Sequence, residues 1–155
     1  MLKIDGSFGE GGGQILRSTI CLSVLLEKPV EIFNIRSKRP NPGLRPQHVH
    51  AVKALSTIFN ATVENLCVGN QSIKFYPNSL HTDKGITELE IDIGTAGSIS
   101  LILQTIVPAI SLSKKNISMK IIGGTDVIAS PTIDYMKYVV SEAYKNIGII
   151  FKIDV

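Results

Sequence analysis

Four glycines surround one carboxylate in the segment FGEGGGQILRST, which runs from Phe8 to Thr19. Gln14 and Arg17 follow the glycines at the start of an apolar segment, and their spacing puts both on one face of a helix. A loop that follows a strand and opens a helix offers backbone amides and a helix N-terminus to an anion. The segment does not fit GxxxxGK[ST], because no lysine follows, nor GxGxxG, because Gln14 replaces the last glycine. The Walker and Rossmann types of nucleotide site are therefore not indicated.

Glu10 stands within this glycine loop and would repel a phosphate group unless a divalent cation lay between them. Mg²⁺ binds one or two carboxylates together with phosphate oxygens, so Glu10 is a candidate metal ligand. The simpler alternative is a helix start in which glycines permit the turn and Glu10 interacts with the helix dipole. The loop alone favours this alternative. Arg17 favours the metal-ligand interpretation instead, because it can join an anion site with Glu10 and its metal.

A second candidate for anion binding is the segment between Glu31 and Glu64, which contains no acidic residue. Its basic residues are Arg36, Lys38, Arg39, Arg45 and Lys53. Such a concentration of positive charge indicates an anionic partner such as phosphate or nucleic acid, although a solvated basic surface is the commoner outcome. The prolines and the glycine in RSKRPNPGLRPQ stiffen the loop. We therefore expect the arginines to be presented rather than mobile. Because this loop and the glycine loop follow strands that run the same way, Arg36 and Arg39 should lie at the same end of the sheet as the glycine loop.

The composition suits one domain of ordinary size, with 44% hydrophobic residues, 19% charged residues and a net charge of +3. Cys21 and Cys67 show no CxxC spacing, so we expect two reduced, buried thiols in a cytoplasmic protein. The N-terminus lacks the pattern of a signal peptide. The most apolar run, 99–112, is too short to span a bilayer and is typical of a buried core helix.

The elements that must position these residues alternate between strands and helices. We expect strands at 2–5, 30–35, 62–68 and 72–76 and helices at 13–26 and 47–59. The second helix begins just after Pro46, and the pair Gly69-Asn70 indicates a hairpin between the last two strands. An α/β (α+β) fold follows from this order.

The chain also resembles itself at an offset of 87 residues. Ile4 then falls on Ile91, and apolar positions on strands and helices stay in phase, although few pairs are identical. We interpret this as a duplicated β-α-β-α-β-β unit, with repeats at 1–85 and 86–155. Val155 corresponds to Val68, so the second repeat ends before its last strand, and we expect the chain to be the front part of something longer.

Taken together, GEGGGQILRS, IRSKRPNPGLRPQH, IGTAGS, LQT and GGTD resemble the RNA 3'-terminal phosphate cyclase family over essentially the whole chain. The resemblance implies repeated β-α-β-α-β-β units, as in enolpyruvyl transferases and the C-terminal domain of translation initiation factor 3. It also implies an enzyme that uses ATP and a divalent cation, Mg²⁺ or Mn²⁺, to convert an RNA 3'-phosphate into a 2',3'-cyclic phosphate. The family reaction runs through an adenylylated histidine and an activated RNA end, from which the 2'-hydroxyl expels AMP.

The resemblance implies a role for each residue that matches a family motif. Glu10 would be the metal ligand, and the catalytic residues would be Arg17, Arg36 and Arg39. The phosphates and the reacting RNA end would also be held by Gln14, Gln47 and Gln104, the last of which takes the place of Arg17 in the second repeat. A buried glutamine with a local hydrogen-bond partner is the simpler interpretation of Gln104. Ile128 would contribute to the nucleotide site from the loop opened by GGTD, at the place where the family often has a proline stacked on adenine.

The family's nucleophilic histidine lies near the C-terminus of a longer chain. The histidines present here are His48, His50 and His81. His48 follows Gln47 in the pair QH, whose histidine is not the nucleotide acceptor in the family. His50 and His81 have no motif around them. We therefore expect this chain to carry most of the pocket but to be inactive alone.

Two other functions remain open at this point. The non-catalytic branch of the family is an RNA- and protein-binding scaffold in ribosome assembly, but it lacks the constellation that Glu10, Arg17, Arg36 and Arg39 would form here. A stand-alone RNA-binding module would need no carboxylate in a glycine loop, and the chain has only 6% aromatic residues for stacking. The expected partners are ATP and an RNA 3'-phosphate end, without a membrane; a homodimer stays open.

Overall fold

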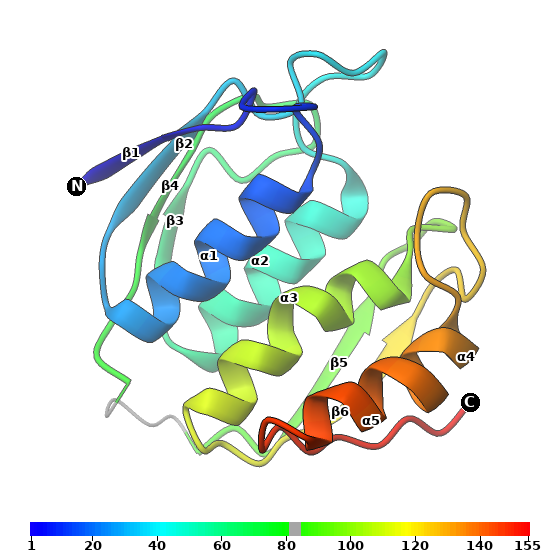
Figure 1. Ribbon diagram of the computed structural model, residues 1–155. Helices are drawn as coiled ribbons and strands as arrows, with labels where there is room; N and C mark the ends of the chain where they lie inside the picture. Colours follow the sequence, from blue (N-terminus) through cyan, green and yellow to red (C-terminus); the bar gives the residue numbers. More distant parts are fainter. Residues whose placement is uncertain (81–84) are drawn as a thin grey trace.

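The first half of the chain forms a four-stranded sheet, seen at the left of Figure 1. The computed structural model describes residues 1–80 and 85–155. The strands are β1 (Leu2–Asp5), β2 (Val30–Phe33), β3 (Thr62–Glu64) and β4 (Ile73–Tyr76), and their order in the sheet is β1-β2-β4-β3. β1 is parallel to β2, whereas β4 is antiparallel to both of its neighbours. The β3–β4 hairpin predicted from the sequence is therefore present, and the predicted α/β (α+β) class is confirmed.

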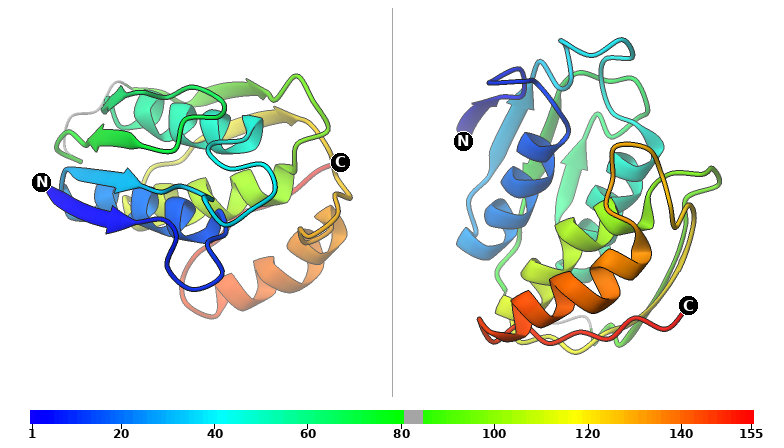
Figure 2. Two further views of the ribbon diagram at one scale, coloured as in Figure 1. Left: turned by 90° about the horizontal axis from the view of Figure 1, so that it is seen from above. Right: turned by 45° about the vertical axis from the view of Figure 1, so that its right-hand side comes forward.

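Two helices pack on this sheet, α1 (Gln14–Leu26) and α2 (Pro46–Ile58) (Figures 1 and 2). α2 begins at Pro46 because the first helical turn needs no N–H from this residue. Both helices bury a stripe of apolar residues at helical spacing: Leu16, Ile20, Val24, Ala51, Leu55 and Ile58. The predicted bounds of both helices are correct to within one residue.

The apolar run of the second half forms α3 (Ile99–Leu112), as expected for a core helix. Ile102 and Ile106 are fully buried, and α3 packs against both α1 and α2. It connects the parallel strands β5 (Glu88–Asp92) and β6 (Ser118–Ile122), which form a second sheet. The Ser98 side chain caps the helix by accepting a hydrogen bond from the Leu101 N–H. α3 thus joins the two halves in one apolar core.

A last helical segment covers the outer side of α3 (Figure 1). It consists of α4 (Ile133–Tyr135), the π-helical turn η1 (Met136–Val140) and α5 (Ser141–Lys145). Ile133 and Met136 pack there against Leu103 and Val107 of α3, together with Ile149.

The elements from β5 to α5 follow the same order as those from β1 to α2, as a repeat requires. The duplication itself stays an interpretation. Residues 149–155, which correspond to 62–68 at the offset of 87, form no strand. β3 forms its ladder with β4 alone, and among the described residues the second sheet has no strand in the place of β4.

Two strands also end earlier than predicted. β2 stops at Phe33 and β3 at Glu64, because Asn34 and Asn65 adopt the left-handed backbone conformation, with φ of 53° and 62°. The early end of β3 places Cys67 in the hairpin loop, where it is exposed, so the expectation of two buried thiols is wrong for this residue. Cys21 is buried, and burial raises its pKa to about 11. None of the helices in 1–80 and 85–155 is long and apolar enough to cross a bilayer.

Candidate functional site

The basic loop between β2 and α2 is fixed against the β3–β4 hairpin. The Leu44 N–H donates to the Asn70 carbonyl and the Gly69 N–H donates to the Leu44 carbonyl, each at 2.9 Å. Gly43 lies beside them with φ of +79°, and a β-carbon at this position would clash with the backbone of Gly69. The loop is therefore held at the end of the sheet by backbone bonds, which adds to the stiffness expected from its prolines.

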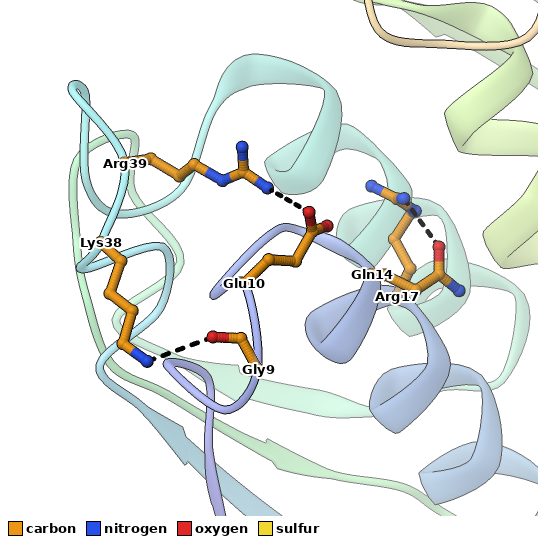
Figure 3. A network of polar contacts seen from close by, with 6 residues as sticks. All are labelled: Gly9, Glu10, Gln14, Arg17, Lys38 and Arg39. Carbon is orange, nitrogen blue, oxygen red and sulfur yellow. Dashed lines mark hydrogen bonds and ion pairs between the residues drawn. The ribbon is translucent and has the colours of Figure 1, made fainter.

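The basic loop contacts the glycine loop directly (Figure 3). The Lys38 Nζ donates to the Gly9 carbonyl at 3.2 Å, and the Lys38 side chain also packs on Gly11. The Arg39 Nη2 lies 3.1 Å from the Glu10 Oε2 in an ion pair, with side-chain exposures of 37% and 81%. The expectation that the two loops meet at one end of the sheet is thus confirmed by these contacts.

Arg17 is half-buried on the first turn of α1, the helix that follows the glycine loop. Its Nη2 donates to the Gln14 Oε1 at 2.8 Å (Figure 3). The Gln14 Nε2 in turn donates to the Ser18 hydroxyl at 2.9 Å. Its Nε is buried and has no hydrogen-bond partner. Burial lowers the pKa of the Arg17 guanidinium, although an arginine stays charged in proteins. A buried charged donor without a partner favours an anion, because such a group is costly to leave unpaired.

His48 lies between the glycine loop and the arginines. Its Nδ1 accepts a hydrogen bond from the Arg45 backbone N–H at 3.0 Å, so Nε2 carries the ring proton in the neutral form. A β-carbon at Gly13 would clash with this Nε2 and would also meet the Arg17 guanidinium. Burial lowers the pKa of His48, and the charges of Arg17, Arg36 and Arg45 act in the same direction, so that together they bring it to about 3. The site therefore keeps His48 neutral and concentrates positive charge around it.

Arg36 has a structural role in the basic loop. Its Nη1 donates to the carbonyls of Asn41 at 2.6 Å and Gly43 at 3.3 Å. Its own backbone is left-handed, with φ of 53°. Burial lowers the pKa of Arg36, and the charges of Arg45 and Arg39 act in the same direction. Arg36 thus contributes charge to the cluster while it holds the loop that carries Arg39.

The other predicted site residues lie outside this cluster. The Gln47 Oε1 accepts a hydrogen bond from the Ser98 N–H at 3.4 Å, so Gln47 joins the start of α2 to the start of α3. Gln104 is half-buried in the middle of α3, and Ile128 is 98% exposed on the loop between β6 and α4. The structure therefore brings together Glu10, Gln14, Arg17, Arg36 and Arg39. Among the described residues, no hydrogen bond or ion pair joins Gln47, Gln104 or Ile128 to them.

The cluster can accommodate a divalent cation at Glu10. Among residues 1–80 and 85–155 there is no group of three or more histidine, cysteine, aspartate or glutamate side chains that could hold a metal. Glu10 offers one exposed carboxylate, which suffices for Mg²⁺ when phosphate oxygens and water supply the other ligands. A cation bound with a phosphorylated ligand is therefore compatible with Glu10, whereas a closed site made of protein ligands is not.

Comparison with known proteins gives the family. Residues 8–155 match the family model described as RNA 3'-terminal phosphate cyclase. This chain belongs to the RNA 3'-terminal phosphate cyclase family. The resemblance inferred from GEGGGQILRS and the motifs after it is confirmed.

Individual cyclases are similar to the chain over almost all of its length. Proteins named RNA 3'-terminal phosphate cyclase from Saccharolobus islandicus and Saccharolobus solfataricus are each 53% identical over 154 residues, which cover 99% of this chain and 44% of theirs. The cyclase of Pyrococcus furiosus is 52% identical over 149 residues, which cover 96% of this chain and 42% of its own. The chain thus spans less than half the length of these cyclases.

Three residues of the cluster, Lys38, Arg45 and His48, are not indicated as site residues by the sequence. In the sequence, Lys38 and Arg45 stand out only as charge. The contact of Lys38 with Gly9 depends on how two loops meet, whereas the bond from the Arg45 N–H to His48 is local to the first turn of α2. His48 had a usable signal. It falls on the stripe of α2 that also contains Val52 and is buried like it, with 3% of its surface exposed.

Proposed function

We propose that the complete protein converts an RNA 3'-phosphate into a 2',3'-cyclic phosphate with ATP. The observation that carries the proposal is the half-buried Arg17, whose unpartnered Nε lies at the start of α1 among further positive charges. Phosphoryl and nucleotidyl transfer depend on positioning and on charge neutralisation, which arginines supply well. Membership in the cyclase family supports the same reaction. We further propose that the protein works in the cytoplasm.

The proposed reaction has three steps, as the family resemblance implies. A histidine nitrogen attacks the α-phosphorus of ATP and expels pyrophosphate. The adenylyl group then passes to an oxygen of the RNA 3'-phosphate, which restores the histidine. Finally, the vicinal 2'-hydroxyl loses its proton and attacks the 3'-phosphorus, which closes the cyclic phosphate and expels AMP.

The residues of the cluster would hold the phosphates through these steps. Arg17, oriented by Gln14, would donate to a phosphate oxygen from its free Nε. Arg36 and Arg39 would add positive charge along the basic loop. Glu10 would hold Mg²⁺ or Mn²⁺, which supplies charge neutralisation when bound, and Arg39 would then exchange its ion pair with Glu10 for a phosphate.

The remaining predicted residues would act from neighbouring elements. The Gln47 side chain uses its Oε1 to accept from Ser98, which leaves the amide N–H groups as the donors it offers to a phosphate. Gln104 would bind phosphate from α3, and Ile128 would contact the adenine. These three assignments rest on the family motifs.

His48 does not suit the role of the nucleophile. Its Nδ1 lone pair accepts from the Arg45 N–H, and its Nε2 carries the proton and packs against Gly13. No nitrogen of His48 is therefore free to attack a phosphorus atom. His50 is half-buried on the same helix, and His81 lies outside the described residues.

The proposal is tested by incubating the complete protein with ATP, Mg²⁺ and an oligoribonucleotide that ends in a 3'-phosphate. We expect ATP-dependent conversion to an end that resists phosphatase and regains sensitivity after mild acid opens the cyclic phosphate. An oligonucleotide that is bound but never converted, under any metal, would instead favour the non-catalytic scaffold.

A further inference from the structure

Phe8 presents an aromatic ring to solvent at the tip of the glycine loop, with 81% of its surface exposed. All five phenylalanines of the sequence lie in the described residues, and Phe8 alone among them is exposed; Phe59 and Phe75, for example, are at most 2% exposed. A single exposed apolar side chain is common on protein surfaces, so exposure by itself indicates nothing. The setting of Phe8 is what makes it informative.

The backbone of Phe8 is held in place rather than free. Its N–H donates to the Asp5 carbonyl at 3.4 Å, and its carbonyl accepts from the Gly11 N–H at 3.1 Å. The next residue, Gly9, is bound by Lys38 of the basic loop. The ring therefore projects from a fixed loop that is flanked by a cation and lies two residues from Glu10.

Single-stranded RNA is recognised by this combination of features. Basic side chains follow the phosphate backbone, while aromatic rings at fixed positions stack on the unpaired bases. We propose that Phe8 stacks on a base at the 3' end of the RNA substrate, beside the phosphate-binding cluster. The inference rests on the proposed function, and it adds a residue that positions the RNA through its base rather than its phosphate.

Direct RNA binding by the complete protein tests this role. The probes are two short single-stranded oligoribonucleotides with a 3'-phosphate, one with a normal terminal base and one abasic at that position. Phe8→Ala is expected to weaken binding of the normal probe about tenfold, within the range known for base stacking. Phe8→Tyr, which keeps a ring, should bind within about twofold of wild type, whereas Phe8→Leu should resemble Phe8→Ala.

The abasic probe separates stacking from other contacts. The wild type should lose about the same factor on the abasic probe, and Phe8→Ala should lose nothing further there, because the same contact is already absent. If Phe8→Ala instead bound the abasic probe about tenfold more weakly than the wild type does, the two losses would be independent and the proposal would be overturned. A similar loss of ATP affinity in Phe8→Ala would also overturn it, because the ring would then stack on adenine. A melting temperature of Phe8→Ala lowered by several degrees would do the same, because the ring would then make a contact within the protein.

The outcome is separate from that of the proposed function. If the oligonucleotide is not cyclised, but Phe8→Ala weakens binding of the normal probe and not of the abasic probe, Phe8 stacks on RNA and the proposed reaction fails. If cyclisation proceeds with the same KM for RNA in wild type and Phe8→Ala, the reaction stands and the stacking role is wrong.

Discussion

At the scale of single residues, the site depends on the close approach of Gly13 and His48. Gly13→Ala would place a methyl group against the His48 Nε2, and the ring cannot retreat easily because the Arg45 N–H holds it. We expect this change to lower the free energy of unfolding by about 1–3 kcal/mol, as overpacking usually does. Chemical denaturation of wild type and variant measures it.

Gly12→Ala is the matched control for this prediction. The atoms nearest to a β-carbon at Gly12 would be the ends of the Glu10 and Arg39 side chains, at 3.0 and 3.1 Å, and these can move. The control should change the free energy of unfolding by less than about 0.5 kcal/mol. Equal effects of the two substitutions would mean that His48 does not fill the space beside Gly13.

The buried His48 also predicts how stability depends on pH. The folded state holds the pKa of His48 at about 3, below its ordinary value of 6.5, so between these values the unfolded chain binds a proton that the folded chain does not. Stability should therefore fall by about 1.4 kcal/mol per pH unit as the pH drops below 6.5. Asn keeps an acceptor for the Arg45 N–H but does not titrate, so His48→Asn should show a shallower slope between pH 6.5 and 4. If the stability of wild type and His48→Asn fell equally steeply with pH, protonation of His48 would cost the folded state little free energy.

Glu10→Gln tests the role of the carboxylate in the glycine loop. The ion pair of Glu10 with Arg39 is largely exposed and contributes at most about 1 kcal/mol, so folding should be unaffected. If Glu10 holds the cation, adenylylation by the complete protein should fall steeply and recover in part at high Mg²⁺ or Mn²⁺. Titration of both metals against wild type and variant, with thermal melts alongside, measures this. An identical metal dependence would mean that Glu10 binds no metal.

The sequence predicted some of these contacts and missed others. The contact between Gln14 and Arg17 follows from helical spacing, which is local. The bonds of Arg36 to its own loop and of Lys38 to Gly9 depend on where the β3–β4 hairpin fixes that loop, and helical or strand periodicity carries no information on this.

At the scale of elements, the core helices could be predicted because they carry strong local signals. Pro46 marks the start of α2, and the apolar run marks α3. The segment 149–155 could not be predicted in the same way. It has strand-forming residues, but β3 forms its ladder with β4, and the described residues of the second half contain no counterpart of β4.

The position of α3 between the two halves leads to a prediction about cooperativity. Ile106 is fully buried and belongs to the core shared with α1 and α2, so Ile106→Ala should cost about 2–5 kcal/mol. Leu112→Ala, at the exposed end of the same helix, should cost less than about 1 kcal/mol. Denaturation followed by two spectroscopic probes should give one coincident transition in both variants. Separate transitions would mean that the two halves fold independently.

At the scale of the whole molecule, the cluster places several positive charges around one carboxylate at the end of the first sheet. The sequence indicated this concentration of charge, and family membership agrees with a phosphate-bearing substrate. The positions of Gln104 and Ile128, and the contact of Gln47 with Ser98, could not be derived from the motifs, because they depend on how the second half of the chain is placed.

Transfer of a labelled adenylyl group from ATP to the complete protein tests the central claim most directly, with wild type compared with Arg17→Gln. Loss of a charged, half-buried phosphate contact is worth about 1.5–3 kcal/mol, so the rate should fall about ten- to hundredfold. Lys3→Gln, which alters an exposed lysine on β1, should label at the wild-type rate. Equal labelling rates for wild type and Arg17→Gln would contradict the account, because Arg17 would then hold no phosphate of ATP.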